Sequence, residues 1–386
     1  MVPFPAQDHL NQFLHLSHLI LAYNIPIHYA CTATHNHQAM LRVHGWDLNS
    51  VSDIHFHDLK IPPFLTPSLN PNAPNKFPSH LQPLLNASLH LRDPMASLLR
   101  ELSSKATRII VINDSLMGLV VQDLVTIPNA ESYTFYTMGK ALELDPYSKI
   151  TTKDLPSLEG CFTTEFQKLS SRYLYNTCRV IEGAYMDLME KIEGDKKHWA
   201  IGPINPVRNI GSNKRHKCLE WLDKESQNSG IYIEQKFIWA LRDADKGDVF
   251  INGELRKAKI PKGFEERVKG RGMVVKDWAP PLEIISHQST VAFISHSWPM
   301  ASDQPRNTVL ITKLLKVGIV VNDWSHRDEL VTSSTVEKAM KLLMASEEGD
   351  EIRKRAVDLG GAIEKSIEEG GVPRMELDSF ITHITR

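Results

Sequence analysis

The sequence predicts an α/β protein made of two domains. Short apolar runs rich in β-branched residues alternate with longer segments of helical periodicity, a pattern typical of parallel sheets covered by helices. The alternation occurs twice, and 386 residues are enough to bury two hydrophobic cores. A stretch rich in Pro, Gly and basic residues, 202–217, lies between the two halves. We therefore expect an N-terminal domain over residues 1–205 and a C-terminal domain over residues 206–386.

The first half contains five short apolar runs that predict strands. They are residues 25–31, 54–56, 108–112, 132–135 and 199–201. Three amphipathic segments predict helices. They are residues 10–21, 81–102 and 165–192.

The second half repeats this pattern. The predicted strands are residues 231–233, 237–241, 273–275, 291–295 and 318–321, and the predicted helices are residues 335–345, 351–369 and 374–384. Only three residues separate the strand 231–233 from the strand 237–241. Parallel neighbours need a crossover of roughly a dozen residues or more. The sheet of the second domain is therefore predicted to be incomplete near residues 231–241.

Composition excludes several classes of partner. The 44 basic and 46 acidic side chains are balanced, which gives no indication of nucleic acid or an anionic membrane as a partner. There is no apolar run of transmembrane length, and residues 1–5 lack the features of a signal peptide. We expect a soluble, cytoplasmic protein.

Cysteines and histidines give no indication of a metal site. The spacing of the four cysteines is not that of metal ligands, which favours buried thiols in a reducing compartment. These cysteines are Cys31, Cys161, Cys178 and Cys218. The 17 histidines include no HExxH motif. Four of them alternate along the chain and are interpreted as strand or loop residues with satisfied polar atoms: His35, His37, His55 and His57.

His9 is a candidate general base, because it lies at the start of the helix predicted over residues 10–21. A helix N-terminus disfavours an imidazolium ion and keeps the ring able to accept a proton. The adjacent Asp8 acts in the opposite direction, since a carboxylate raises the pKa of a histidine. Spacing alone favours a different interpretation, in which Asp8 caps the helix and His9 is an ordinary first-turn residue.

Asp114 is the candidate partner of His9. It follows the strand 108–112, and functional groups of α/β proteins gather at the carboxyl ends of parallel strands. A carboxylate bonded to the far imidazole nitrogen would fix the tautomer and stabilise the charge that develops on the ring. Asp114 is also placed to cap a helix that begins near Leu116, and the two roles are compatible.

The most specific motif begins Trp278-Ala279-Pro280-Pro281, passes through Phe293-Ile294-Ser295-His296 and ends in Asp303-Gln304. It resembles the sugar-nucleotide signature box of plant UDP-dependent glycosyltransferases, which opens with WAPQ, passes through HCGWNS and ends in DQ. Residues 5–9 resemble the PAQGH motif of the same family, with Asp8 in place of its glycine. Residues 112–115 resemble its IHDS-type motif.

The resemblance implies a GT-B architecture, in which two Rossmann-like domains face each other across a cleft and the last helix returns to the first. It implies that His9 is the catalytic base and that Asp114 orients it. The donor-binding residues that it implies are Trp278, which stacks on uracil, Ala279, His296, which meets the diphosphate, and Asp303 and Gln304, which bind the sugar hydroxyls. It implies UDP-glucose as co-substrate, a small hydroxylated acceptor, a monomer, and no metal or other cofactor.

The signature box is shorter than in the family. Trp278 and Gln304 are 26 positions apart, about 17 fewer than in the family box, and that many residues would span ~25 Å as a helix. The Asn, Ser and Glu that contact phosphate and ribose are missing, and so is the helix whose N-terminus would hold the diphosphate. Pro281 replaces a nucleoside-contacting glutamine. Since stabilisation of the leaving group is usually the largest catalytic term, we expect impaired activity.

Within the family the chain looks closest to the zeatin O-glucosyltransferase group. The segments that carry this similarity are residues 9–17, 32–36, 42–47 and 236–246. They imply transfer of glucose to the side-chain hydroxyl of the cytokinin zeatin. Two alternatives remain open: a catalytically inactive protein that binds small molecules, and a non-functional product that does not fold stably.

Overall fold

The chain forms two compact units. The computed structural model describes residues 1–41, 53–62, 86–137, 172–194, 196–204, 215–225, 237–240, 260–275, 279–294, 304–322, 329–368 and 370–386. The first unit comprises Met1–Ile210 and Gly360–Arg386, and the second comprises Gly211–Leu359. Helix α12 (Glu347–Ser366) begins in the second unit and ends in the first.

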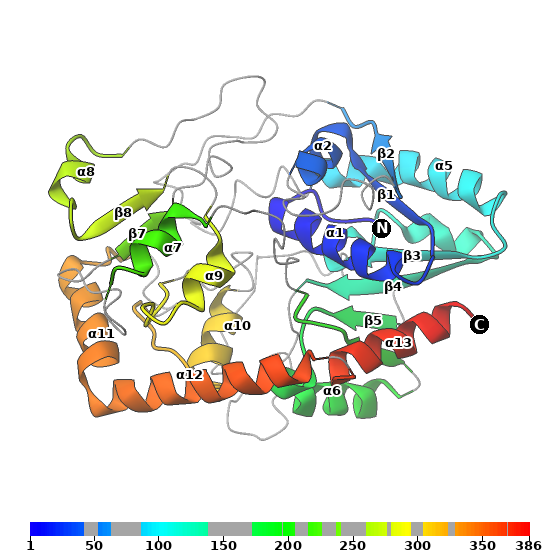
Figure 1. Ribbon diagram of the computed structural model, residues 1–386. Coiled ribbons are helices and arrows are strands. Elements are labelled where there is room, and N and C mark those ends of the chain that lie inside the picture. Colours follow the sequence, from blue (N-terminus) through cyan, green and yellow to red (C-terminus); the bar gives the residue numbers. More distant parts are fainter. Residues whose placement is uncertain are drawn as a thin grey trace. The chain divides into compact units, whose positions relative to one another are not determined.

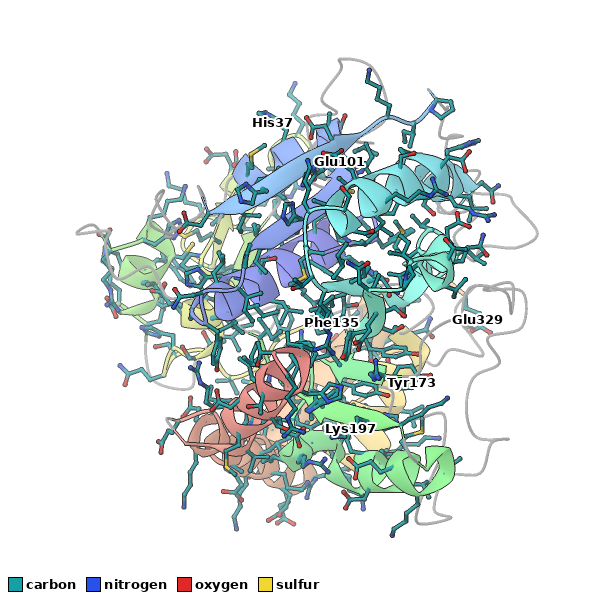
Figure 2. The ribbon with its side chains drawn as sticks, turned by 90° about the vertical axis from the view of Figure 1, so that its right-hand side faces the viewer. His37, Glu101, Phe135, Tyr173, Lys197 and Glu329 are labelled. Carbon is teal, nitrogen blue, oxygen red and sulfur yellow. The ribbon has the colours of Figure 1, made fainter. Side chains whose placement is uncertain are left out.

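Parallel strands form the centre of the first unit (Figure 1). Strands β1 (Ile27–Thr32) and β2 (Ile54–Leu59) pair with each other. A four-stranded sheet follows in the order β3 (Ile109–Asp114), β4 (Ala130–Tyr136), β5 (Arg172–Tyr175) and β6 (Lys197–Ala200). Figure 2 shows Phe135, Tyr173 and Lys197 on the neighbouring strands β4, β5 and β6.

Met1 and Val2 connect these two groups of strands. The amide of Ala30 in β1 donates to the carbonyl of Met1 at 3.0 Å. The amide of Val2 donates to the Ile112 carbonyl at 2.8 Å, and Asp114 donates back to Val2 at 2.9 Å. The two residues thus lie between β1 and β3 and hold both strands in register.

Helices cover both faces of the four-stranded sheet. Residues of α1 (Gln7–Leu21) and α13 (Val372–Ile384) share one hydrophobic core with Phe135, Leu174 and Trp199. Side chains alternate between the faces of a strand, so Tyr175 points to the opposite face. There Tyr175 packs against Met186 of α6 (Arg179–Glu193). The other helices in the described part of the first unit are α2 (Ala33–Leu41), η1 (Leu89–Leu91), α5 (Arg92–Ser103), η2 (Ser115–Met117) and η3 (Gln122–Thr126).

Helix α13 is held by polar contacts as well as by its apolar face. Glu376 accepts hydrogen bonds from Nε of Arg179 at 2.5 Å and from the amide of Ala200 at 3.2 Å. Phe380 is fully buried and meets the rings of Tyr133 and Trp199 edge-on, with centroids 5.3 Å away in both pairs. The last helix is therefore an integral part of the core of the first unit.

The described part of the second unit contains a parallel pair of strands, β7 (Phe237–Ala240) and β8 (Gly272–Val275). Cys218, Val275 and Ala279 form a small core beside this pair. The helices described in this unit are α7 (Lys217–Leu222), α8 (Phe264–Arg267), α9 (Pro281–Ile285), α10 (Gln304–Val309), the π-helical turn η7 (Leu310–Leu314) and α11 (Ser333–Ala345), followed by α12.

Several predictions of secondary structure are confirmed. The five strands predicted in the first half are present with small shifts in their bounds, as are two in the second half, β7 and β8. The helices predicted over residues 10–21, 335–345, 351–369 and 374–384 correspond to α1, α11, α12 and α13. The predicted strand 231–233 lies outside the described residues.

Other predictions are wrong. The helix predicted over 165–192 is present only as α6, and residues 172–175 within that range form β5. Strands β4 and β6 supply hydrogen bonds on both sides there, and aromatic side chains fit a pleated surface. The strand predicted over 291–295 is absent from the described residues 291–294, where Phe293 and Ile294 are more than half exposed. Residues 318–321 form no strand either. His35 and His37 lie on helix α2, not on a strand or loop.

The packing of Phe380 predicts a large effect of its removal. Phe380→Ala should lower the free energy of unfolding by about 3–5 kcal/mol, since a buried ring is replaced by a cavity between Tyr133 and Trp199. Met375→Ala on the same helix is the matched control, because Met375 is 60% exposed and its loss should change stability by less than about 0.5 kcal/mol. Urea unfolding of both variants measures the difference, and equal values would contradict this packing.

Burial of imidazole rings predicts a loss of stability in acid. Burial lowers the pKa of His15, His28 and His35 to about 4, and contact with His57 adds to the effect at His28. The unfolded chain binds these protons near pH 6.5 and the folded chain does not. Stability should therefore be complete above about pH 6.5 and be lost as the pH falls towards 4, by up to about 1.4 kcal/mol per pH unit for the fully buried His35.

Urea unfolding at a series of pH values tests this expectation. His28→Gln should make the dependence shallower, whereas a change at the exposed His90 should leave it unaltered. A stability that stays constant between pH 7 and pH 5 would show that the imidazoles protonate freely in the folded chain.

Candidate functional site

His9 lies in the first turn of α1 and packs against Phe4. Helix α1 begins at Gln7 and its N-cap is Ala6, so the interpretation of Asp8 as the cap is wrong. His9 is the third helical residue and only 3% exposed. The ring of Phe4 meets its imidazole edge-on at a centroid distance of 5.5 Å. The side chain of Asp8 lies outside the described residues.

Asp114 ends strand β3, and both of its carboxylate oxygens are engaged. Oδ1 accepts a hydrogen bond from the amide of Leu116 at 2.9 Å, so Asp114 caps the turn η2 as the sequence predicted. Oδ2 lies 2.6 Å from Nδ1 of His9. Asp114 is completely buried, and its two partners come from different elements. The structure thus brings together the two side chains that the sequence marked as a pair.

This contact fixes the tautomer of His9. An ionised carboxylate can only accept hydrogen bonds, so Nδ1 of His9 must carry a proton and donate it to Asp114. In the neutral ring, the lone pair is then on Nε2. A buried carboxylate beside the ring also stabilises an imidazolium ion. The arrangement is one that can take up a proton at Nε2 and hold the positive charge that results.

A second polar contact lies at the same edge of the sheet, and the sequence did not predict it. Asn176 directly follows β5, and its Nδ2 donates to Oε1 of Gln12 in α1 at 2.8 Å. Its Oδ1 accepts from the amide of Ile204 at 2.6 Å. The helix predicted over 165–192 includes residues 172–175, so the sequence does not place Asn176 at the carboxyl end of a strand. The aromatic run of residues 173–175 is the signal that could have revealed it.

Most of the predicted donor-binding residues lie outside the described residues. This holds for Trp278, His296 and Asp303. Gln304 is the first residue of α10, with a side chain that is not described. Ala279 is 6% exposed and packs against Cys218 and Val275, which places it in the core of the second unit. Their roles stay predictions.

The described part of the signature box is fastened by His287. Its Nδ1 accepts from the amide of Ser289 at 3.2 Å, so Nε2 carries the proton and donates to Asp223 at 3.1 Å. That hydrogen bond, together with Arg215, lowers the pKa of the Asp223 carboxyl. The hydroxyl of Ser289 donates to the carbonyl of Leu222 at 3.2 Å. The turn after α9 is thereby tied to the end of α7.

In the part of the chain that the structure describes, no group of three or more His, Cys, Asp or Glu side chains is placed to hold a metal ion. Among the helices described, none is both long and apolar enough to cross a membrane.

Comparison with known proteins identifies the class. The family model described as "Glycosyltransferase, N-terminal domain" matches residues 1–206. Zeatin O-glucosyltransferase of Phaseolus lunatus is 47% identical, over all of this chain and 96% of that protein. Zeatin O-xylosyltransferase of Phaseolus vulgaris is 45% identical, over all of this chain and 97% of that protein. Cis-zeatin O-glucosyltransferase 2 of Zea mays is 34% identical over the same shares.

Solved structures show the same fold. A UDP-glucosyltransferase from Polygonum tinctorium matches with a TM-score of 0.74 at 17% identity, over all of this chain and 98% of that one. A transferase from Siraitia grosvenorii in complex with UDP matches with a TM-score of 0.73 at 19% identity, over all of this chain and 99% of that one. These matches confirm the predicted α/β class and GT-B architecture.

The chain therefore belongs to the plant UDP-dependent glycosyltransferases. Its alignment with the Phaseolus lunatus enzyme extends over 448 positions, 62 more than the 386 residues present here. That relative accordingly has at least 62 residues without a counterpart in this chain, in keeping with the shortened signature box.

The tautomer of His9 can be tested directly. In Asp114→Asn the amide oxygen can still cap Leu116, but the amide nitrogen then faces Nδ1 of His9 and donates to it. The proton of the ring should move to Nε2, and loss of a charge-assisted bond should lower the free energy of unfolding by about 1.5–3 kcal/mol. Nitrogen NMR of ¹⁵N-histidine-labelled protein reports the tautomer, with His9→Gln to assign the signal. A signal unchanged by Asp114→Asn would refute the assignment of the proton to Nδ1.

Proposed function

We propose that this protein transfers glucose from UDP-glucose to the side-chain hydroxyl of zeatin. The single observation that carries the proposal is the buried hydrogen bond of 2.6 Å between His9 and Asp114. It supplies a base whose proton-accepting nitrogen, Nε2, is set by a carboxylate, as deprotonation of a hydroxyl requires. Membership of the glycosyltransferase family supplies the reaction class.

In the proposed reaction His9 acts on the acceptor. Nε2 of His9 takes the proton of the acceptor hydroxyl while that oxygen attacks the anomeric carbon of glucose. A carbon–oxygen bond forms there, and the bond from the same carbon to the diphosphate breaks. UDP departs with the bonding electron pair. Asp114 keeps its hydrogen bond to Nδ1 throughout and stabilises the imidazolium ion that forms.

The donor site is proposed on the residues of the signature box. Trp278 stacks on uracil, His296 meets the diphosphate, and Asp303 with Gln304 binds the sugar hydroxyls. Stacking on an aromatic side chain contributes about 1–3 kcal/mol per base. The two Phaseolus relatives differ in the sugar that they transfer, since one is a glucosyltransferase and the other a xylosyltransferase. The glutamine that ends the family's signature box is associated with glucose as the donor sugar, and Gln304 occupies that position here.

The acceptor is proposed from the relatives. Four of them that align with the whole chain bear names that specify transfer to an oxygen of zeatin or cis-zeatin. The proposed pocket wall is the carboxyl edge of β3 to β5, where Asp114 and Asn176 lie. We propose that the reaction uses no metal or other cofactor. We place the protein in the cytoplasm as a monomer, with no nucleic acid or membrane partner.

Turnover should be slower than in a relative with a complete box. The residues missing between Trp278 and Gln304 would include the helix N-terminus that holds the diphosphate. Removal of one preorganised donor to a developing negative charge typically costs about 10²–10³ in kcat. Loss of a whole helix end also loosens the position of the nucleotide, and positioning can account for ~7–11 kcal/mol of a barrier.

A glucosylation assay tests both parts of the proposal. The purified chain and the Phaseolus lunatus enzyme are each incubated with UDP-glucose and zeatin, and the O-glucoside is measured. We expect product from this chain at a kcat at least about 100-fold below that of the relative. His9→Gln should reduce it by a further factor of about 10²–10⁴. Met375→Ala, at an exposed position on α13, serves as the matched control and should leave the rate unchanged.

Calorimetric titration with UDP and with zeatin separates the alternatives. Binding of both supports the enzyme, and binding of zeatin alone indicates a binding protein without transfer activity. Binding of neither indicates a non-functional product. Turnover equal to that of the relative would show that the missing segment of the box is dispensable, whereas insertion of that segment from the relative should strengthen UDP binding if our account is correct.

A further inference from the structure

The hydrogen bond between Gln12 and Asn176 has no role in the reaction proposed above, yet it joins the helix of the base to the sheet. We infer that Gln12 and Asn176 are positioning residues, which hold α1 at the rotation that keeps His9 on Asp114. This inference rests on the proposed function only for its effect on rate, because the effect on the His9 ring is a property of the structure alone.

Asn176 is a fixed anchor. Its backbone amide donates to the Tyr136 carbonyl at the end of β4 at 2.9 Å. Its Oδ1 accepts from the amide of Ile204, which can only donate, so the orientation of the side-chain amide is determined. Gly202 fits tightly beside it, since a Cβ at that glycine would lie 2.4 Å from Oδ1 of Asn176. The side chain of Asn176 therefore cannot follow a moving helix, and α1 has to adapt to it.

Gln12 and His9 lie on the same side of α1. Residues three apart in a helix are neighbours on its surface. His9 reaches Asp114 at the end of β3, and Gln12 reaches Asn176 at the end of β5. Strand β4 lies between these two anchors in the sheet. A side-chain contact to one strand leaves a helix more freedom to turn about its axis than side-chain contacts to two different strands do.

The sensitivity of the base to such a turn follows from geometry. A ring about 6 Å from the helix axis moves by ~1 Å when the helix rotates by ~10°. A displacement of that size at a reacting group can reduce a rate by about 10²-fold. The apolar side chains of α1 constrain its distance from the sheet, but they are non-directional and define its rotation less sharply. Hydrogen bonds add direction: the Tyr29 hydroxyl of β1 donates to the Leu10 carbonyl at 2.9 Å, and the bond of Gln12 adds a directional contact at the end of β5.

The test replaces Gln12 and observes the ring of His9. Gln12→Met keeps the length of the side chain and removes the acceptor for Asn176. Gln12→Ala also removes the acceptor, and it shortens the side chain to a methyl group. Gln12→Glu keeps an oxygen that can accept from Asn176 and should restore the contact. Ser17→Ala is the matched control, because it also removes one hydrogen bond of α1, from Ser17 Oγ to the Phe13 carbonyl, without touching a strand end.

Histidine nitrogen NMR and the glucosylation assay are both recorded for each variant. We expect a single His9 tautomer, protonated on Nδ1, in the unsubstituted chain, in Gln12→Glu and in Ser17→Ala. Gln12→Met and Gln12→Ala should give a mixture of tautomers, with kcat lower by about 10- to 100-fold and KM for zeatin changed by less than about twofold.

The outcomes separate the inference from the function. A single Nδ1-protonated tautomer in Gln12→Met and Gln12→Ala would overturn the inference, whatever the activity. A mixture in Ser17→Ala as well would overturn it too, because any weakening of α1 would then suffice. If the tautomer responds as expected but the unsubstituted chain makes no O-glucoside, the inference holds and the proposed function fails.

Discussion

A carboxylate buried without contact to water needs partners for both of its oxygens, and this constraint organises the site of the first unit. Asp114 meets it with two donors, the amide of Leu116 and the imidazole of His9. The first donor belongs to the turn after β3, and the second belongs to α1. Loss of either would leave part of a charge uncompensated in the interior, which is far more costly than loss of a surface contact. The same requirement therefore holds the base in place and ties the first helix to the sheet.

The two units differ in how completely they retain the residues of their proposed sites. In the first, the base, its carboxylate and the anchor Asn176 stand at the carboxyl ends of neighbouring strands, each with its hydrogen bonds made. In the second, His287 fastens the turn after α9, but the signature box, to which that turn belongs, is about 17 residues shorter than in the family. The proposed acceptor chemistry thus retains its machinery, while the proposed donor chemistry depends on the part of the chain that has been shortened.

Sequence reasoning succeeded where local pattern and tertiary context agree. The apolar runs predicted as strands in the first half form β1 to β4 and β6 in parallel pairs, and the motifs around His9 and Asp114 gave the pair that the structure brings together. It failed at β5, where four residues beside a long helical pattern form a strand because two neighbouring strands pair with them. It failed again at residues 291–294 and 318–321, whose apolar runs resemble strands although the chain forms none there. Pairing partners distant in sequence decide such segments, and periodicity carries no information about them.

The place of α13 has a consequence for the synthesis of the protein. Domains at the N-terminus usually fold while the rest of the chain is still being made. Here the core around Tyr133 and Trp199 is closed by Phe380, six residues before the end of the sequence. While the ribosome is still producing the second unit, one face of the first sheet lacks the part of its cover that α13 supplies, which leaves Tyr133 and Trp199 more open to water or to chaperones. The first unit begins folding first and is completed last, so a defect in the second unit delays the closure of both.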